Sequence, residues 1–398
     1  MKILAIESSC DETAAAVIGD DCEILSNVVV SQVDIFAAYG GVIPEVAARS
    51  HLEVILPVIH KALNDVALTK DDIDYIAVTH TPGLLGSLLI GTLTARMLAI
   101  LWDKPLYAVH HLKSHIYANW LNARVEDNAL SVQHGCVSPH LKNRRKHSPS
   151  SQATILHKKS LSSVSVSSQS DLPEFPLLAL VVSGGHTQII YMEKHNKFEI
   201  IGTTRDDAVG ECFDKVAKIL GLTYPGGPSI AECAKAGDVN KYRLPHPKVG
   251  GLDFSFSGLK TAVLRAVQGE LGVPINTPSY DLAGKLTEQQ RMDFAASFQE
   301  TACEILVEKL EMALEAYMGV KSLVVAGGVS ANKVLREKAL KRLSVGSDGI
   351  SRKVYFPELK FAGDNAAMVG AAAYYEILSG VEPTDPYVLN IAPRQEIA

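Results

Sequence analysis

The sequence predicts an α/β protein of two lobes, each built on the same unit of three strands followed by helices. Two observations lead to this fold class. At 398 residues the chain is too long for one compact core, and its 47% hydrophobic and 21% charged content is typical of globular proteins. In addition, the strand and helix pattern occurs twice, which indicates a duplicated unit. Two unrelated α/β domains are the alternative.

The first copy of the unit opens the chain and the second begins near residue 177. Short polar turns separate the strand-like runs "KILAIESS", "TAAAVIGD" and "EILSNVVV", and "VIPEVAARSHLEVILPVIHKAL" follows with helical periodicity. The second copy reads "LLALVVSGG", "TQIIYMEK" and "KFEIIGTT", followed by the helical run "GECFDKVAKILGL". In both copies a buried strand runs into a small polar turn, and a threonine opens the next strand.

A segment without periodicity separates the two copies. Residues 126–173 are rich in serine and basic side chains, as in "HLKNRRKHSPSSQ", and we predict a disordered insertion. It is either a solvated loop or a segment that contacts phosphate. The predicted domains are therefore a first lobe over residues 1–125, completed by a C-terminal helix over 365–398, and a second lobe over 174–364.

Composition limits the function classes. With 38 basic and 44 acidic residues, the net charge of −6 argues against purely electrostatic binding of nucleic acid. The six cysteines show no C-x-x-C spacing, which favours reduced thiols. A strand-like run starts at the N-terminus, and the apolar run "GLLGSLLIGTLTARMLAILW" contains an arginine, so we expect a buried helix there rather than a membrane span. A cytoplasmic protein is expected.

Three glycine pairs stand where strands end or turns begin, and they suggest a nucleotide cleft between the lobes. They are Gly184-Gly185, Gly226-Gly227 and Gly327-Gly328. Backbone N–H groups can approach a phosphate closely at such turns, although each pair alone could be an ordinary turn. The P-loop and Rossmann glycine patterns are absent from the sequence, so neither chemistry is indicated.

Three histidines lie within six residues in "YAVHHLKSHIYANW". His111 and His115 are four residues apart and would share one face of a helix, as metal ligands do. In a chain with 13 histidines, one such pair is close to chance. A third candidate ligand, Asp364, precedes an alanine-rich run and could instead cap that helix. The spacing alone leaves both interpretations open.

Further motifs establish a resemblance over nearly the whole chain outside the insertion. "GGVIPEVAARSH", "HHLKSHIYA", "VVSGGHTQ", "DDAVGECFDKVAKILGLTYPGGP", "FSFSGLKTAV", "VAGGVSANKVLR" and "GDNAAM" closely resemble the universal tRNA threonylcarbamoyltransferase family. The resemblance implies the duplicated actin-like ATPase fold of the ASKHA, ribonuclease H-like class, with a nucleotide cleft between its lobes. It also implies transfer of a threonylcarbamoyl group from threonylcarbamoyl-AMP to N6 of adenosine 37 in tRNAs that read codons beginning with adenine.

The resemblance implies roles for particular residues. His111, His115 and Asp364 are expected to bind one divalent metal ion per subunit, assigned as Fe²⁺ with Zn²⁺ as the alternative, and His110 to be a packed or supporting histidine. Two imidazoles and one carboxylate leave coordination positions open for a substrate. The catalytic base is not assigned, and Asp11 and Glu12 are the candidates. The expected substrate-binding residues are Val181, Val182, Ser183, Gly184, Gly185, Asp214, Gly227 and Asn332.

The expected partners are tRNA, a TsaB-like paralogue that docks on the first lobe, and a small TsaE-like ATPase, with no membrane. Three positions depart from the family pattern: Lys113-Ser114 between the metal histidines, Thr81, and Ala362. Lys113 brings a positive charge beside the site. A carbamoyltransferase of the same fold acting on a small-molecule acceptor is the main alternative. A metalloprotease lacks support, because the glutamate of H-E-x-x-H is missing between His111 and His115.

Overall fold

The computed structural model describes residues 1–122, 130–133, 172–247, 249–345 and 349–397. Its regular elements follow the predicted order. The first part of the chain contains β1 (Ile3–Glu7), β2 (Glu12–Ile18), β3 (Ile24–Ser31), α1 (Val33–Ala37), α2 (Pro44–Asn64), β4 (Tyr75–Thr81), α3 (Leu85–Trp102), β5 (Leu106–His110), α4 (His111–Tyr117) and β6 (Leu130–Gln133). The second part contains β7 (Leu177–Val182), β8 (Thr187–Lys194), β9 (Lys197–Thr203), α5 (Val209–Leu220), α6 (Gly226–Cys233), α7 (Ser257–Glu270), α8 (Glu288–Ala316), β10 (Ser322–Ala326), α9 (Lys333–Leu343), β11 (Lys353–Tyr355) and α10 (Ala366–Leu378).

The two sheets have the same topology, which confirms the predicted duplication. Within the described residues, the first sheet has the strand order β5-β4-β1-β2-β3-β6 and the second β11-β10-β7-β8-β9. In each, an antiparallel meander of three strands is extended by two parallel strands on the side of its first strand. The equivalent first strands are β1 and β7, and both end at the middle of the molecule. They end at Glu7 and Val182.

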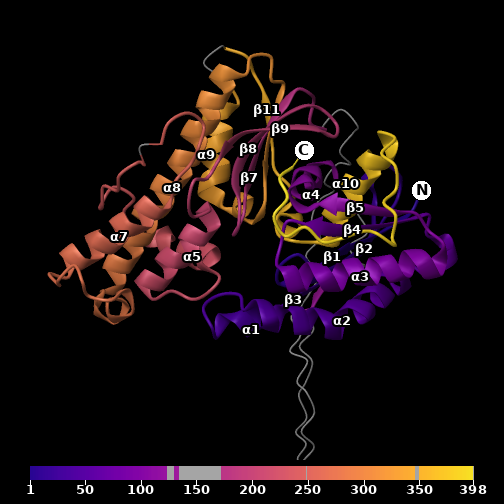
Figure 1. Cartoon of the computed structure of the whole chain (residues 1–398). Helices are drawn as coiled ribbons and strands as arrows, with labels where there is room; N and C mark the ends of the chain where they lie inside the picture. The colour runs from indigo at the N-terminus through magenta and orange to yellow at the C-terminus, as the bar shows by residue number, and fades with distance from the viewer. Residues whose placement is uncertain (123–129, 134–171, 248, 346–348, 398) are drawn as a thin grey trace, which may run out of the picture.

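Helices and sheets alternate in five layers (Figure 1). Helices α2 and α3 cover the outer face of the first sheet and α8 and α9 that of the second, while α5 and α7 pack against α8. The remaining layer, α4 and α10, lies between the two sheets, and its buried residues form one core with the inner faces of both. This shared core joins the lobes, and it is the layer from which the candidate metal ligands come.

Helix α10 can lie close to the first sheet because it is built from small residues. Its first turns read "AAMVGAAA", and a Cβ at Gly370 would collide with Ile18 of β2. The predicted C-terminal helix over 365–398 is too long, since α10 ends at Leu378. The chain beyond it follows the first lobe, where Thr384 N donates to Leu106 O and Ala392 N donates to His80 O.

Two other sequence predictions need correction. Residues 130–133 fall inside the predicted disordered insertion over 126–173, yet they form strand β6 and pair in parallel with β3. The rest of that insertion, apart from residues 172 and 173, lies outside the described residues. Helix α3 was expected to be buried, but only one of its faces packs on the sheet and on α2. Its other face leaves large apolar side chains exposed: Leu85, Leu89, Leu93, Met97, Ile100 and Leu101.

Helix α3 is also long and apolar enough to span a membrane by length and composition, and one third of its apolar window is buried in the protein. A leucine-rich helix of this kind has no polar stripe to show which face meets solvent. The periodicity therefore could not reveal its exposed side.

Candidate metal centre

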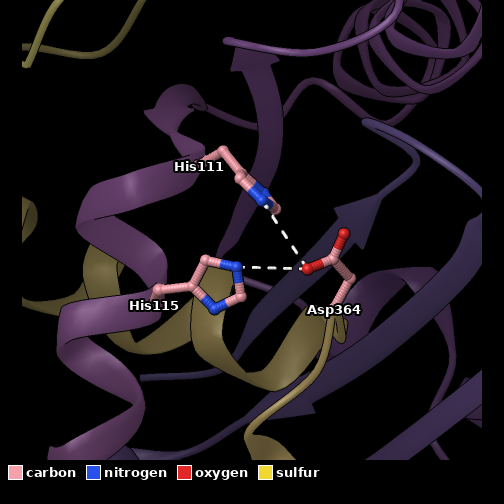
Figure 2. A group of neighbouring side chains, drawn as sticks. All are labelled: His111, His115 and Asp364. Atoms are coloured by element: carbon pink, nitrogen blue, oxygen red, sulfur yellow. Dashed lines mark ion pairs between the residues drawn. The ribbon is translucent and has the colours of Figure 1, made fainter. Parts of the chain in front are cut away.

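His111, His115 and Asp364 come together in the layer between the sheets (Figure 2). The two histidines lie one helical turn apart on α4, and Asp364 comes from the segment just before α10. Asp364 Oδ1 is 3.1 Å from His115 Nε2 and 3.6 Å from His111 Nε2. One ligand atom from each residue falls within a group no wider than 4.8 Å. This geometry places three donor atoms around one point.

The local sequence holds α4 in this position through His110. This residue ends β5, and its Nδ1 accepts a hydrogen bond from Leu112 N at 3.2 Å, which caps α4. Its Nε2 lies 3.0 Å from Gln395 O. Burial lowers the pKa of His110 to about 3, so its ring is neutral. Both ring nitrogens of His110 are therefore engaged by the backbone, and the side chain does not join the triad.

Asp364 is not the helix cap that the sequence allowed. The N-cap of α10 is Asn365, whose side chain accepts a hydrogen bond from Met368 N at 3.1 Å. The Asp364 carboxylate therefore does not cap the helix, and it points towards the two histidines. The alternative interpretation of Asp364 as a capping residue is wrong.

The electrostatics of the centre suit a cation. Burial alone would raise the pKa of Asp364, but the charges of His111 and His115 hold it well below its usual range. Burial alone would lower the pKa of His111, but the carboxylates of Asp364 and Glu7 raise it to about 9. Both nitrogens of His115 are buried without a hydrogen-bond partner among the described residues, although Asp364 is near. Two imidazoles, one of them without a hydrogen-bond partner, and one carboxylate are a donor set that a divalent metal ion fits.

The glycine turn of the second lobe approaches this centre. Ser183, Gly184 and Gly185 follow β7, and both glycines are exposed, so that a Cβ added at either would meet open space. Ser183 N donates to His186 O at 2.9 Å and His186 N donates to Ser183 Oγ at 3.1 Å, which makes the turn tight. Val181 and Val182 are fully buried, so only their backbone could contact a ligand.

His186 is a residue that the sequence analysis missed, although it lies in the quoted motif "VVSGGHTQ". Burial, together with the charges of His111 and His115, lowers its pKa to about 4. This coupling shows that His186 faces the triad from the opposite lobe. A histidine next to a glycine turn is a signal that could have singled it out.

Asp11 and Glu12 follow the end of β1 and form a carboxyl pair. Burial raises the pKa of both groups, and the charge of Asp364 raises each further. The interaction between the two carboxyl groups lowers the pKa of Asp11 and raises that of Glu12. Ser31 Oγ also donates to Glu12 Oε1 at 3.0 Å.

Asp214 faces Asp11 from the second lobe. Burial raises the pKa of Asp214, the hydrogen bond from Gly226 N at 2.6 Å lowers it, and Asp11 raises it. Tyr224 lies among the same groups: burial raises its pKa, and Asp11 and Asp214 add to the rise. Asp214 is therefore not a plain surface carboxylate, and Tyr224 is a second neighbour that the sequence analysis missed.

Gly227 and Asn332 differ in how free they are to bind a substrate. Gly227 has open space around it. Asn332 is the N-cap of α9, where its Oδ1 accepts from Val334 N and Leu335 N, and its Nδ2 donates to Gln299 Oε1 at 2.8 Å. The Asn332 side chain is thus occupied by the helix and its neighbour.

Two departures from the family pattern have local explanations. The Lys113 ammonium lies 4.0 Å from the Glu376 carboxylate of α10 and 4.9 Å from the centre of the Phe198 ring. Its charge is therefore balanced locally. The hydroxyl of Thr81 donates a short hydrogen bond to Ala392 O, which fastens the C-terminal segment to the end of β4.

Comparison with solved structures identifies the fold. HypF from T. kodakarensis superposes with a TM-score of 0.56 at 14% sequence identity, over 95% of this chain and 48% of that chain. A full-length HypF in a phosphate- and nucleotide-bound form gives a TM-score of 0.51 at 13% identity, over 96% of this chain and 47% of that one. These likenesses, together with the repeated strand order, show the duplicated actin-like ATPase fold.

Comparison of sequences identifies the family. A family model described as TsaD, tRNA N6-adenosine threonylcarbamoyltransferase, matches residues 23–132 and 157–371. A protein of that name from Symbiobacterium thermophilum is 46% identical over 95% of this chain and 92% of its own length. Another from Caldicellulosiruptor bescii is 40% identical over 99% of this chain and 100% of its own length. The chain therefore belongs to the tRNA N6-adenosine threonylcarbamoyltransferase family, and it is an acyltransferase that modifies tRNA.

Proposed function

We propose that the chain transfers the threonylcarbamoyl group from threonylcarbamoyl-AMP to N6 of adenosine 37 in tRNAs that read codons beginning with adenine. We further propose that it does so with one divalent metal ion, Fe²⁺ or alternatively Zn²⁺, held by His111, His115 and Asp364. The observation that carries the proposal is the convergence of these three donors in a full-length member of the family. A tRNA substrate agrees with the expected cytoplasmic location.

The residues around the triad suit an acyl transfer. A bound divalent cation would supply a Lewis acid that polarises the transferred carbonyl. The exposed backbone at Gly184 and Gly185 offers N–H groups to the phosphate of the donor. Asp11 and Glu12, whose pKa values burial raises, are the two candidates to accept a proton from the attacking amine. Asp214 and Gly227 would line the same space from the second lobe.

The test offers the metal-loaded protein threonylcarbamoyl-AMP with either unmodified tRNA or a set of small amine and hydroxyl acceptors. We expect N6-threonylcarbamoyladenosine in the tRNA, detected by mass spectrometry of nucleosides, and no stable product from the small acceptors. Parallel reconstitution with Fe²⁺ under anaerobic conditions and with Zn²⁺ identifies the active metal. Transfer to a small acceptor with tRNA left unmodified would support the alternative carbamoyltransferase.

The exposed face of α2 and α3 supports the proposed TsaB-like partner. The two helices lie side by side on the first lobe (Figure 1), and Ala48 of α2 comes so close to Gly86 of α3 that a Cβ there would be 2.9 Å away. Leu52 and Leu56 on α2 are exposed, as is the apolar face of α3. An apolar surface of this kind marks a protein interface. We propose that the paralogue docks here and that a TsaE-like ATPase joins the complex.

A charge placed on this face would test the docking proposal. The double variant Leu89→Lys, Met97→Lys should retain its bound metal but lose stimulation of transfer by the paralogue. The surface variant Met312→Lys on α8, which is also exposed, serves as the control and should be stimulated normally. Full multi-turnover transfer by the isolated wild-type chain would contradict the need for partners.

A further inference from the structure

We propose that Glu7 is a positioning residue of the metal centre, which orients the His111 ring so that its Nε2 points at the metal. This inference rests on the proposed metal site and adds a residue to it. Glu7 is the last residue of β1 and is 0% exposed. A carboxylate buried so completely is costly unless its neighbours hydrogen bond to it or carry the opposite charge.

Three groups contact the Glu7 carboxylate. Ser9 N donates to Oε1 at 2.5 Å, and Thr79 Oγ1 donates to Oε2 at 2.6 Å. His111 Nδ1 lies 3.2 Å from the same Oε2. Ser9 Oγ lies 3.2 Å from His111 Nδ1 as a second neighbour. The carboxylate is thus fixed by β4 and by the turn after β1, and in turn it contacts the ring.

These contacts determine which nitrogen of His111 carries the proton. An ionised carboxylate only accepts hydrogen bonds, so the contact at Oε2 places the proton on Nδ1. In the neutral ring, the form that can bind a metal ion, Nε2 is then left with a lone pair, and it is the nitrogen that lies 3.6 Å from Asp364 Oδ1 (Figure 2). Metal-bound histidines commonly donate their second N–H to a carboxylate in this way.

The second histidine of the centre lacks such support. His115 Nδ1 is buried and has no hydrogen-bond partner within the described ranges. Its ring is held by packing in α4 and by contact with the ring of His111, whose centre is 4.6 Å away. Glu7 therefore orients one of the two imidazoles, and that ring in turn packs against the other.

The test compares metal binding by folded Glu7→Gln and wild-type protein. Both oxygens of the Glu7 carboxylate accept hydrogen bonds, whereas a glutamine has only one oxygen. Its NH₂ group would therefore face a hydrogen-bond donor at one of the two positions. We expect the dissociation constant for Co²⁺, measured by chelator competition, to rise 10–100-fold, which is typical for loss of an outer-shell partner. NMR of ¹⁵N-labelled histidine should also show that the His111 ring no longer keeps its proton on Nδ1. Thr79→Val, which removes one contact to Oε2, should weaken binding less.

Glu376→Gln is the matched control, because Glu376 is also a buried carboxylate of the middle layer and does not contact His111. Its Co²⁺ affinity should equal that of wild type. An unchanged affinity in folded Glu7→Gln, or in Thr79→Val if Glu7→Gln does not fold, would overturn the inference. If wild type itself binds no metal, the proposed metal site fails instead, so the two failures are distinct. A loss of affinity in Ser9→Ala with none in Glu7→Gln would assign the positioning role to Ser9.

Discussion

The ends of β1 and β7 occupy equivalent places in the duplicated fold but are held by different kinds of contact. At the end of β1, buried side chains contact one another: Glu7 contacts Thr79 and His111, and Thr13 Oγ1 lies 2.7 Å from His51 Nδ1. Backbone also comes close there, since a Cβ at Gly83 would lie 2.5 Å from Ser9 O. At the end of β7, close approach of the backbone is the main kind of contact. A Cβ at Gly210 would lie 2.5 Å from Ser183 O, and one at Gly327 would collide with Val182 O.

This difference shows how a duplicated unit can serve two purposes. Interlocking side chains fix the place of a charged group, which a metal centre requires. Glycine contacts keep a turn rigid while leaving its outer side open, which a phosphate-bearing donor requires. Glu7 and Val182 end the two equivalent strands, and both are fully buried, but only Glu7 carries a charge. We infer that the first lobe holds the metal and the second receives the donor.

The largest effect expected from this division is the loss of a metal ligand. His111→Ala, His115→Ala and Asp364→Ala should each lose metal and transfer together, by more than the 10–100-fold typical of an outer-shell partner. The lobes should stay folded, because their cores lie on the outer faces of the sheets as well as between them. Elemental analysis, transfer rate and circular dichroism check the three points.

His110→Ala is the control for that set. It should keep its metal and lose about 1 kcal/mol of stability, because it caps α4 without touching the triad. An Asp364 variant that retained both metal and transfer rate would remove this residue from the centre, and a different third ligand would have to be found.

The second largest effect should come from the glycine contacts of the other lobe. In Gly210→Ala the new methyl group would meet Ser183 O at 2.5 Å and Gly184 Cα at 2.9 Å, so the turn must move. A shift of this kind should raise the KM for threonylcarbamoyl-AMP about tenfold or more while metal content stays normal. The control is Gly269→Ala near the end of α7, where the methyl group meets open space. If Gly210→Ala lost metal instead, the two strand ends would not act separately.

Much of this arrangement could be predicted from the sequence. The repeated strand runs have the period of buried strands, and their identical order in both sheets follows from the duplication. The pair of His111 and His115 was visible as a spacing, but its partner Asp364 was not, because 249 positions separate it from His115 and its local context also suited a helix cap. Only the resemblance to the family singled it out.

The sequence analysis missed two features, Glu7 and strand β6, each for a physical reason. Glu7 ends a strand that is otherwise apolar, and the sequence does not show that β4 and α4 bring a threonine and a histidine to it. A charged residue within a fully buried run was nevertheless a usable signal, since it must find partners. Strand β6 was missed because four residues within a serine-rich segment carry too little periodicity.

A smaller, pH-dependent effect should separate Glu376 from Glu7. Burial raises the pKa of Glu376 from 4.5 to about 7, and Lys113 opposes the rise. The folded state therefore holds this proton more tightly than the unfolded chain, and the resulting stability is complete below about pH 4.5 and lost as the pH rises through 7. Glu376→Gln stays neutral, so its stability relative to wild type should improve between pH 5 and pH 8, by roughly 1–2 kcal/mol. Urea unfolding at several pH values measures this. A constant difference across that range would show that Glu376 is ionised throughout.

The smallest effect is expected from the segment between the lobes. The family match stops at residue 132 and resumes at 157, and none of the expected site residues lies between residues 134 and 156. Removal of residues 134–156 with a short Gly/Ser bridge keeps β6, so metal content and melting temperature should not change, and transfer at saturating tRNA should stay within about twofold. The basic run "HLKNRRKH" lies in the removed part. If it contacts RNA phosphates, the deletion should raise the KM for tRNA and weaken its dependence on salt while the maximal rate is kept. Loss of the maximal rate itself would make this segment part of the active site, and the division of labour between two strand ends would then be incomplete.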